Sequence, residues 1–338
     1  MPSYTPPFHM TDQILNLVAE ISELIGIVSV DTHFTPDPKL RRENRILSIY
    51  SSLAIEHNTL SLDQVTAVLN GKRILGPPKD IREVQNAYEA YDRMSELNPL
   101  DMEDLLTAHR LMMQDLVPDA GCFRSGNIGV FRGDQLIHAG TPGDYVPEVM
   151  GQLFDWLRST TIHPLIRGAI FHYEFEFIHP FSDGNGRTGR LWHSLILQQW
   201  RPILAWLPVE NMIHEHQEEY YQALNSSDLT GDTTGFVHFM LRLLRDLLQE
   251  IRAGQNRNVG DNVVNNVADN VVKNRDVVLV ILKKKPDISA REIASLTGLS
   301  SRQVQRIISD LKEDGILIRH GSPRKGSWEI TERKETKL

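Results

Sequence analysis

The chain has 338 residues, of which 41% are hydrophobic and 24% charged, and its formal net charge is −8. This is the composition of an ordinary soluble protein and leaves room for two or three domains. No basic apolar leader stands at Met1 and no apolar run approaches the length of a bilayer span, so we expect a cytoplasmic protein without a membrane partner. The one cysteine, Cys122, excludes an internal disulfide and fits a reducing compartment.

The first hundred residues predict an N-terminal helical region. Apolar residues recur at helical spacing over 11–25 and again from about 40 to 57, with a break at Asp37-Pro38 between them. Further helices are predicted over 62–69 and 83–97, separated by the breaker Gly76-Pro77-Pro78. We therefore assign residues 1–100 to this region.

Residues 101–253 predict the core domain of the chain, which is mainly α with one β-hairpin. Helices are expected over 101–116, 149–158, 162–177, 213–225 and 236–251. Between them, residues 127–132 and 136–140 flank the turn 133–135, which is typical of a hairpin. The spacing of His and Cys indicates no zinc site.

One stretch of this core, residues 179–190, reads HPFSDGNGRTGR and carries the parts of a polyphosphate site. Gly184 and Gly186 allow the backbone to approach an anion closely. A helix beginning near Asn185 would point its free N–H groups and its positive end at that anion. Arg187 and Arg190 are three residues apart, so they lie on one face of such a helix and could grip adjacent phosphates.

Two further residues of the stretch supply chemistry. Asp183 is a hard oxygen ligand suited to Mg²⁺, which needs only one or two protein carboxylates when it bridges phosphates. His179 can accept a proton near neutral pH and could act as a general base.

The stretch resembles the Fic-family signature H-x-F-x-[DE]-G-N-G-R-x-x-R, with every fixed position filled. The resemblance implies a Fic-like helical domain and Mg²⁺-dependent transfer of AMP from ATP to a Ser, Thr or Tyr hydroxyl of a target protein or of the chain itself. It implies that His179 deprotonates the acceptor and that Asp183 holds Mg²⁺. Asn185 and the Gly184 and Gly186 backbone would cradle the phosphates. The structural alternative is a Gly-rich turn whose arginines pair with surface acids.

A second resemblance lies in the segment SLAIEH, residues 52–57, which resembles the family's inhibitory motif [ST]-x-x-x-E-[GN]. It implies that Glu56 and Ser52 belong to an inhibitory helix and that Glu56 pairs with Arg190, which the γ-phosphate requires. His57 departs from the family's Gly or Asn. The alternative is an ordinary i,i+4 pair on a solvated helix.

The resemblance also assigns the surroundings of the site. It implies that the hairpin is a flap that aligns a target segment by main-chain pairing, although a plain surface hairpin fits the sequence as well. It places Tyr220, Tyr221 and Leu224 along an adenine pocket, where a core position is the alternative. A relative's adenine-contacting Asn falls near Asp228, which leaves transfer of UMP or phosphocholine open.

The last part of the chain has a different character. Residues 254–274 are rich in Asn and Val and predict a linker. Residues 275–338 carry a net charge of +5 by our count of 14 Lys/Arg and 9 Asp/Glu, which suggests an anionic partner. Their order of predicted helices and strands resembles a winged helix-turn-helix, a small α+β domain. It implies that Arg302, Gln303 and Arg306 reach bases of DNA, whereas a protein-interaction or homodimerisation module is the alternative.

Two function classes therefore stay open. The first is a protein adenylyltransferase restrained by Glu56, or its close variant that removes AMP with Glu56 positioning water. The second is a DNA-binding regulator whose Fic portion senses a nucleotide. The filled position of His179 favours the enzyme, because nucleotide binding alone does not require a base.

Overall fold

The computed structural model describes residues 4–30, 38–132, 135–255, 278–279, 281–283, 285, 288–297, 304, 307–308, 311–312, 316–322 and 325–330. The chain divides into two compact units, Met1–Val259 and Gly260–Leu338. Most of the predicted linker 254–274 lies outside the described residues, as does most of the predicted recognition helix.

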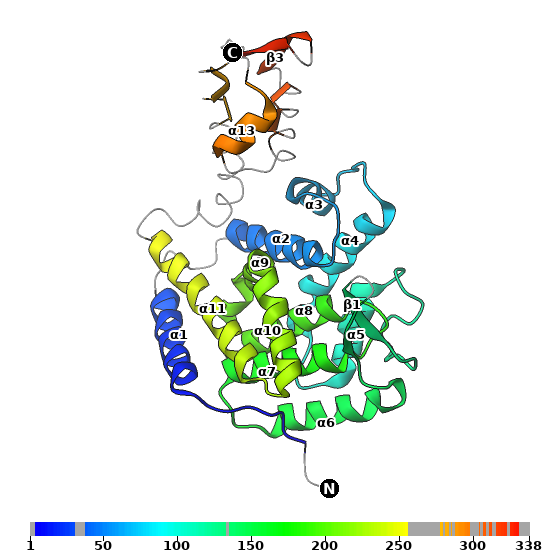
Figure 1. The fold of residues 1–338 in the computed structure, drawn as a ribbon. Helices are drawn as coiled ribbons and strands as arrows, with labels where there is room; N and C mark the ends of the chain where they lie inside the picture. Colours follow the sequence, from blue (N-terminus) through cyan, green and yellow to red (C-terminus); the bar gives the residue numbers. More distant parts are fainter. Residues whose placement is uncertain are drawn as a thin grey trace. The chain divides into compact units, whose positions relative to one another are not determined.

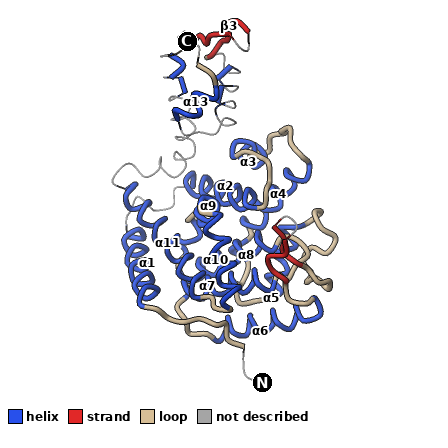
Figure 2. The backbone as a smooth tube through the Cα atoms, viewed as in Figure 1, coloured by secondary structure: helices blue, strands red, loops and turns tan. Residues whose placement is uncertain are grey.

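The first unit is a helical assembly with one hairpin (Figures 1 and 2). Its α-helices are α1 (Asp12–Val30), α2 (Pro38–Ile55), α3 (Leu62–Leu69), α4 (Pro78–Asp92), α5 (Met102–Met113), α6 (Val146–Ser159), α7 (Pro164–Ile178), α8 (Asn185–Trp200), α9 (Val209–Glu215), α10 (Gln217–Thr230) and α11 (Thr234–Gln255). Short 3₁₀ turns lie at Met94–Glu96, Gly143–Tyr145 and Pro202–Trp206.

The pair α7 and α8 forms the centre of this unit and carries the signature between its members. Helix α7 is buried on nearly all sides, which explains why its sequence is apolar without a polar face. Pro164 opens it at the first helical position, where a missing N–H costs no bond. It packs against α6 and α11, while α11 also covers α1. The signature is thus anchored in the core at both ends.

Helix α2 lies across α9 and α4 and brings the predicted inhibitory segment toward α8.

Several helix boundaries differ from those predicted. The predicted helix 83–97 begins earlier, at Pro78, and ends at Asp92 before a 3₁₀ turn. The predicted helix 213–225 is two helices that meet at His216, because α9 ends there and α10 starts afresh. Helix α11 continues to Gln255, into the predicted linker.

The predicted hairpin is present as β1 (Gly129–Arg132) and β2 (Gln135–Ala139), which pair antiparallel. The register shifts between Val130 and Phe131, which is a bulge in the ladder. The unit is therefore mainly α with one hairpin, as the sequence predicts. Among the described helices, none combines the length and the apolar character needed to cross a bilayer.

The second unit joins helices to an antiparallel strand pair. Helix α13 (Ala290–Thr297) precedes β3 (Leu317–Ser322) and β4 (Lys325–Ile330), whose register is continuous. The guanidinium of Arg319 lies 4.4 Å from the centroid of the Trp328 ring. The core of this second unit is apolar and consists of Val278, Leu282, Ile288, Ile293, Ala294, Val304, Ile307, Ile308, Leu311, Leu317 and Trp328. This confirms the predicted α+β character.

Candidate active site

Two residues in the left-handed backbone conformation and the side-chain amide of Asn185 determine the shape of the signature loop. His179 ends α7 with φ 53°, and Gly184 caps α8 with φ 84°. The buried Asn185 side chain accepts from the Phe181 N–H and donates to the Phe181 carbonyl, both at 2.9 Å. The Asn185 side chain therefore holds the loop closed, and a contact of Asn185 with phosphate stays a prediction for its backbone N–H in the first turn of α8.

The imidazole of His179, the predicted base, contacts the backbone of the turn that ends α7. Its Nδ1 lies 3.3 Å from the Glu176 carbonyl oxygen. A carbonyl oxygen can only accept, so this contact favours a proton on Nδ1 and a lone pair on Nε2. The ring tautomer required of a general base thus follows from the turn that ends α7.

A histidine that the sequence did not single out packs against the signature loop. His109 on α5 stacks on Phe181 with ring centroids 3.6 Å apart. Its Nδ1 accepts from the Gly121 N–H, so its Nε2 donates to the Asp183 carbonyl at 2.9 Å. Burial lowers the pKa of His109 to about 4 and keeps this tautomer neutral. Nothing in its spacing to the signature could have indicated this role.

The N-terminal end of α8 is the predicted anion site, and a carboxylate lies there. A Cβ built on Gly184 would lie 2.6 Å from Met113 Sδ, so this position leaves no room for a side chain. A Cβ on Gly186 would collide with Oε1 of Glu56. Because helix N-termini favour negative charge, Glu56 occupies the place where an anion is stabilised.

Arg190 holds the Glu56 carboxylate in that place. Its Nη2 donates to Glu56 Oε1 at 2.7 Å and to the Ser52 carbonyl at 3.0 Å, and its Nε donates to Ser52 Oγ at 3.1 Å. Arg190 is 2% exposed, while the Glu56 side chain is 32% exposed. Burial lowers and the Glu56 charge raises the pKa of Arg190, and the net shift is upward. The contact predicted between Glu56 and Arg190 is therefore present in this structure, and Ser52 adds two bonds to Arg190 that the sequence did not predict.

Helix α2 ends in a Schellman motif, and this turn sets the position of Glu56. His57 N–H donates to the Ala54 carbonyl and Asn58 N–H donates to the Leu53 carbonyl. His57 takes φ 65°, the left-handed conformation for which Gly or Asn is the usual residue. His57 thus adopts the turn despite its side chain.

Arg187, the other signature arginine, is buried and pairs with two carboxylates. Arg187 donates from Nη2 to Asp183 Oδ1 at 2.9 Å and from Nη1 to Glu83 Oε1 at 3.2 Å. Glu83 lies on α4 and also accepts from Asn58 at 2.8 Å. Arg187 therefore orients Asp183, and its reach to a phosphate stays a prediction.

Asp183 fits the predicted role of a magnesium ligand. Its side chain is about half exposed, and the bonds from Arg187 and from the Gly184 N–H fall on one oxygen, Oδ1. Among the described residues no group of three or more His, Cys, Asp or Glu could hold a metal ion. One carboxylate suits Mg²⁺ only when a phosphate supplies further oxygens.

Arg124 joins the signature to the segments that flank the hairpin, a role that sequence reasoning missed. It is 5% exposed. Its Nε donates to the His179 carbonyl at 2.6 Å, and its Nη2 donates to the carbonyls of Ile178 at 3.1 Å and Thr141 at 2.5 Å. Its Nη1 donates to the Gly126 carbonyl at 2.6 Å. One guanidinium therefore ties the residues before and after the hairpin to the turn that carries His179, at the negative end of α7.

The residues predicted for the adenine pocket differ in exposure. Tyr220 is 2% exposed, and its hydroxyl lies 2.9 Å from His172 Nε2, so it is part of the core. Tyr221 and Leu224 are partly buried and pack against that core. Asp228 accepts from the Tyr173 hydroxyl at 2.9 Å. Tyr220 is therefore a core residue, and contact of Tyr221 and Leu224 with a base stays a prediction.

The predicted DNA contacts Arg302, Gln303 and Arg306 lie outside the described residues. Of the expected wing, β3 and β4 are described, with the loop between them outside the described ranges. The structure therefore gives the scaffold of this unit and leaves its contacts as predictions.

Comparisons with known proteins agree with the two units. The Fic/DOC family model matches residues 99–197, and a winged helix-turn-helix DNA-binding model matches residues 278–318. The chain is 33% identical over 248 residues to protein adenylyltransferase fic-1 of Caenorhabditis elegans, covering 69% of this chain and 46% of that protein. It is 30% identical over 228 residues to protein adenylyltransferase Fic of Nematostella vectensis, covering 64% and 51%. The chain thus spans about half the length of these relatives.

Solved structures extend the likeness to both units. A crystal structure of a Fic family protein from Desulfovibrio desulfuricans has 44% sequence identity and a TM-score of 0.72, covering 98% of this chain and 100% of that one. Fic-1 of C. elegans has 29% identity and a TM-score of 0.60, covering 72% and 73%. With its complete signature and this full-length likeness, the chain belongs to the Fic family.

Proposed function

We propose that this chain transfers AMP from ATP to a Ser, Thr or Tyr hydroxyl of a target protein, and that Glu56 restrains the reaction. The observation that carries the proposal is the carboxylate of Glu56 at the N-terminus of α8, held by Arg190. It marks an anion site formed by a helix end and a buried guanidinium. The curated relatives are named for the same activity.

His179 would start the transfer by taking the proton of the acceptor hydroxyl. The hydroxyl oxygen then bonds to the α-phosphorus of ATP, and the bond from that phosphorus to the bridging oxygen breaks, so that pyrophosphate leaves. A positioned base contributes roughly 10²- to 10⁴-fold in rate. The Nδ1 contact with the Glu176 carbonyl supports this role, since it leaves the lone pair on Nε2.

Asp183 would hold Mg²⁺, with phosphate oxygens completing the coordination. Magnesium supplies positive charge that offsets the charge of the phosphates and of the leaving group. Arg187 and the Gly184 N–H fix the orientation of the Asp183 carboxylate. The half-exposed position of Asp183 supports this assignment.

Restraint by Glu56 would follow from competition for one site. Arg190 cannot hold the Glu56 carboxylate and a γ-phosphate in the same place, and two anions at one helix end repel each other. The flap, tied to the site by Arg124, would present a target segment beside His179.

A labelling experiment tests the proposal. The intact chain, Glu56→Gly, His179→Ala and the double variant are incubated with α-labelled ATP, Mg²⁺ and cell lysate, and the labelled proteins are identified by mass spectrometry. We expect weak labelling by the intact chain, strong labelling by Glu56→Gly and none by either His179→Ala protein. A folded Glu56→Gly protein that labels neither itself nor a target would overturn the proposal.

The same experiment separates the variants of this activity. Removal of AMP requires a modified protein as substrate, so it is assayed on targets labelled by Glu56→Gly. UTP and a phosphocholine donor are tested beside ATP, because Asp228 stands near the position of a relative's adenine contact. A nucleotide sensor without transfer activity would bind ATP and label nothing.

A second function, binding of DNA by the C-terminal unit, is favoured by the match of residues 278–318 to a winged helix-turn-helix DNA-binding model. Arg302 and Arg306 would contact the duplex from the predicted recognition helix. Fluorescence anisotropy with duplex DNA at several salt concentrations tests this. We expect affinity that falls with salt, and a loss on Arg302→Ala with Arg306→Ala. Binding that is unchanged in that variant would assign the unit to protein contacts or homodimerisation.

A further inference from the structure

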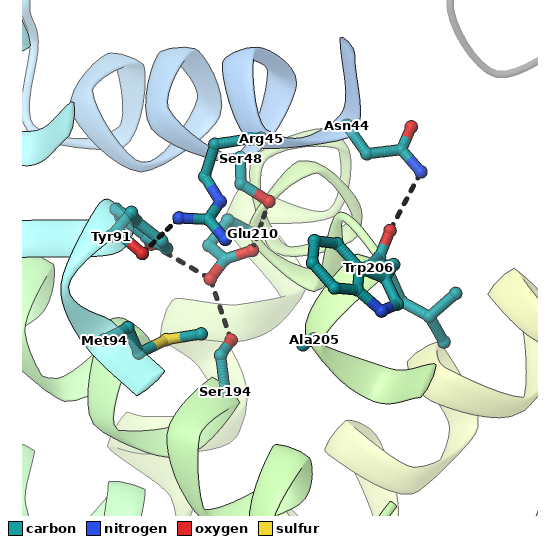
Figure 3. A pocket seen from close by; sticks show the side chains of 10 residues that line it. Asn44, Arg45, Ser48, Tyr91, Met94, Ser194, Ala205, Trp206 and Glu210 are labelled. Atoms are coloured by element: carbon teal, nitrogen blue, oxygen red, sulfur yellow. Dashed lines mark hydrogen bonds between the residues drawn. The ribbon is translucent and has the colours of Figure 1, made fainter. Parts of the chain in front are cut away.

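Glu210 is a buried carboxylate outside the signature, and it joins four helices. It lies on α9 and is 2% exposed. Its Oε2 accepts from Ser48 of α2 at 2.8 Å. Its Oε1 accepts from Tyr91 of α4 at 2.9 Å and from Ser194 of α8 at 2.8 Å. Figure 3 shows these three hydroxyls converging on the carboxylate.

The α2 contact lies on the inhibitory face of that helix. Ser48 precedes Ser52 by one turn, so both side chains lie on one side of α2, and Glu56 follows by one further turn's length, just beyond the end of the helix. Two further bonds hold the same helix: Ser51 Oγ donates to the Asn211 side chain at 3.0 Å, and Gln217 Nε2 donates to the Ile55 carbonyl at 3.3 Å.

The α8 contact lies one turn beyond the arginine that Glu56 engages. Ser194 follows Arg190 by four residues, so both side chains lie on neighbouring turns of one face. Helices α2 and α8 are therefore joined in two places, by Ser52 with Arg190 and, through the carboxylate of Glu210, by Ser48 with Ser194.

The surroundings of Glu210 make its hydroxyl bonds costly to lose. A cavity beside it, lined also by Arg45 and Trp206, has a volume of about 10 Å³, which is room for about one water molecule. Arg45 and Tyr91 both line this cavity, and Arg45 donates to the Tyr91 carbonyl, as Figure 3 shows. In so little water, a lost protein partner cannot be replaced freely by solvent.

We infer that Glu210 is a positioning residue that holds the inhibitory helix α2 against α8, so that Glu56 reaches Arg190. This inference rests on the proposed function, since it concerns the restraint of that activity. Glu210 contacts neither the signature loop nor His179 through any of its hydrogen bonds named above. Loss of its charge is therefore expected to release α2 without altering the machinery of transfer.

The test compares Glu210→Gln in two backgrounds, the intact chain and Glu56→Gly. Gln keeps the size of the side chain but places a donor NH₂ among three hydroxyl groups. With Glu56 present, we expect labelling to rise roughly fivefold, the equivalent of about one net hydrogen bond. With Glu56→Gly we expect no change, because no inhibitory contact is left to release. The control is Glu219→Gln, at an exposed position paired with Arg242, which should change neither background.

A merely structural role for Glu210 predicts a different pattern, with labelling reduced in both backgrounds, and that result would overturn the inference. Unchanged labelling by a folded Glu210→Gln protein with Glu56 present would do so too. If Glu210→Gln does not fold, Ser48→Ala and Ser194→Ala replace it with the same expectations.

A readout without catalysis separates this inference from the proposed function. Hydrogen exchange of the amides in residues 46–56 is measured in the intact chain, Glu210→Gln and Glu219→Gln. Faster exchange confined to this segment in Glu210→Gln supports the inference even if Glu56→Gly labels nothing, in which case only the proposed function fails. Equal exchange in all three proteins overturns it.

Discussion

The Glu56 carboxylate accepts a 2.7 Å hydrogen bond from Arg190 and lies where a side chain on Gly186 would have to go. One group thus satisfies the buried arginine and fills the space above the first turn of α8. Glu56→Gly should therefore lower the melting temperature of the free protein, because Arg190 loses its charged partner. It should also enlarge the rise in melting temperature that ATP with Mg²⁺ produces, because the anion site becomes available.

Thermal shift measurements with and without nucleotide check both effects. Glu56→Gln, which keeps the size and loses the charge, should give an intermediate result. An ATP-induced shift that is equal in Glu56→Gly and the intact chain would contradict competition for the site.

His57→Gly should stabilise the protein by roughly 0.5–1 kcal/mol. His57 takes φ 65°, where glycine avoids the steric penalty of a Cβ. The gain is partly offset because glycine has more freedom in the unfolded chain. Chemical denaturation measures the free energy of unfolding, and His57→Ala serves as the control, since alanine keeps the Cβ. If His57→Gly destabilises the protein as much as His57→Ala does, then the contacts of the imidazole contribute more to stability than the strain of the turn removes.

Arg124→Lys should lower the turnover of the Glu56→Gly enzyme while leaving the affinity for ATP nearly unchanged. Lysine cannot reproduce a planar fork that reaches four carbonyl oxygens, so the flap and the His179 turn lose their common anchor. We expect a loss of roughly 10-fold or more in kcat, given how strongly misplaced groups reduce rates. Kinetics with calorimetric ATP titration separate the two quantities. Equal losses of ATP affinity and kcat would assign Arg124 a general role in folding.

The Glu176 carboxyl should make stability depend on pH. Burial raises its pKa to about 7, against the effect of Arg190 and helped by the charge of Glu56, and its Oε1 is buried against Gly189. Since the folded pKa exceeds the ordinary value of 4.5, the stability contributed by the protonated group is lost as pH rises from about 4.5 through about 7.

Glu176→Gln removes this titration by fixing a neutral side chain. Its melting temperature relative to that of the intact chain should be nearly constant below about pH 4 and should rise by several degrees by pH 8, in line with a contribution on the order of 3 kcal/mol. The exposed variant Glu219→Gln, where hydrogen bonds from His216 and Arg242 lower the pKa of the carboxyl, should show no such rise. A constant difference from pH 5 to pH 8 would contradict the assignment.

The fold and the central site were open to prediction because their determinants are local in the sequence. The helices follow from apolar periodicity, and the signature contains the glycines, the predicted base and the arginines within twelve consecutive positions. The pairing of Glu56 with Arg190 followed from a second short motif. In contrast, Arg124 and His109 act on backbone carbonyls, and Glu210 acts on hydroxyls of three other helices. No sequence spacing encodes such contacts, because they arise only when distant helices pack.

Glu56 and Arg190 are 134 residues apart but belong to one folded unit, so the restraint proposed for Glu56 would act within a single molecule. Its strength would then be set by an effective concentration fixed by the fold, and dilution of the protein would not weaken it. Under the proposed restraint, the apparent dissociation constant for ATP would equal the intrinsic one divided by the fraction of molecules in which α2 has withdrawn, so the apparent affinity would be lower. A cell could therefore tune such an enzyme through any contact that shifts this fraction, without changing how much of the enzyme it makes.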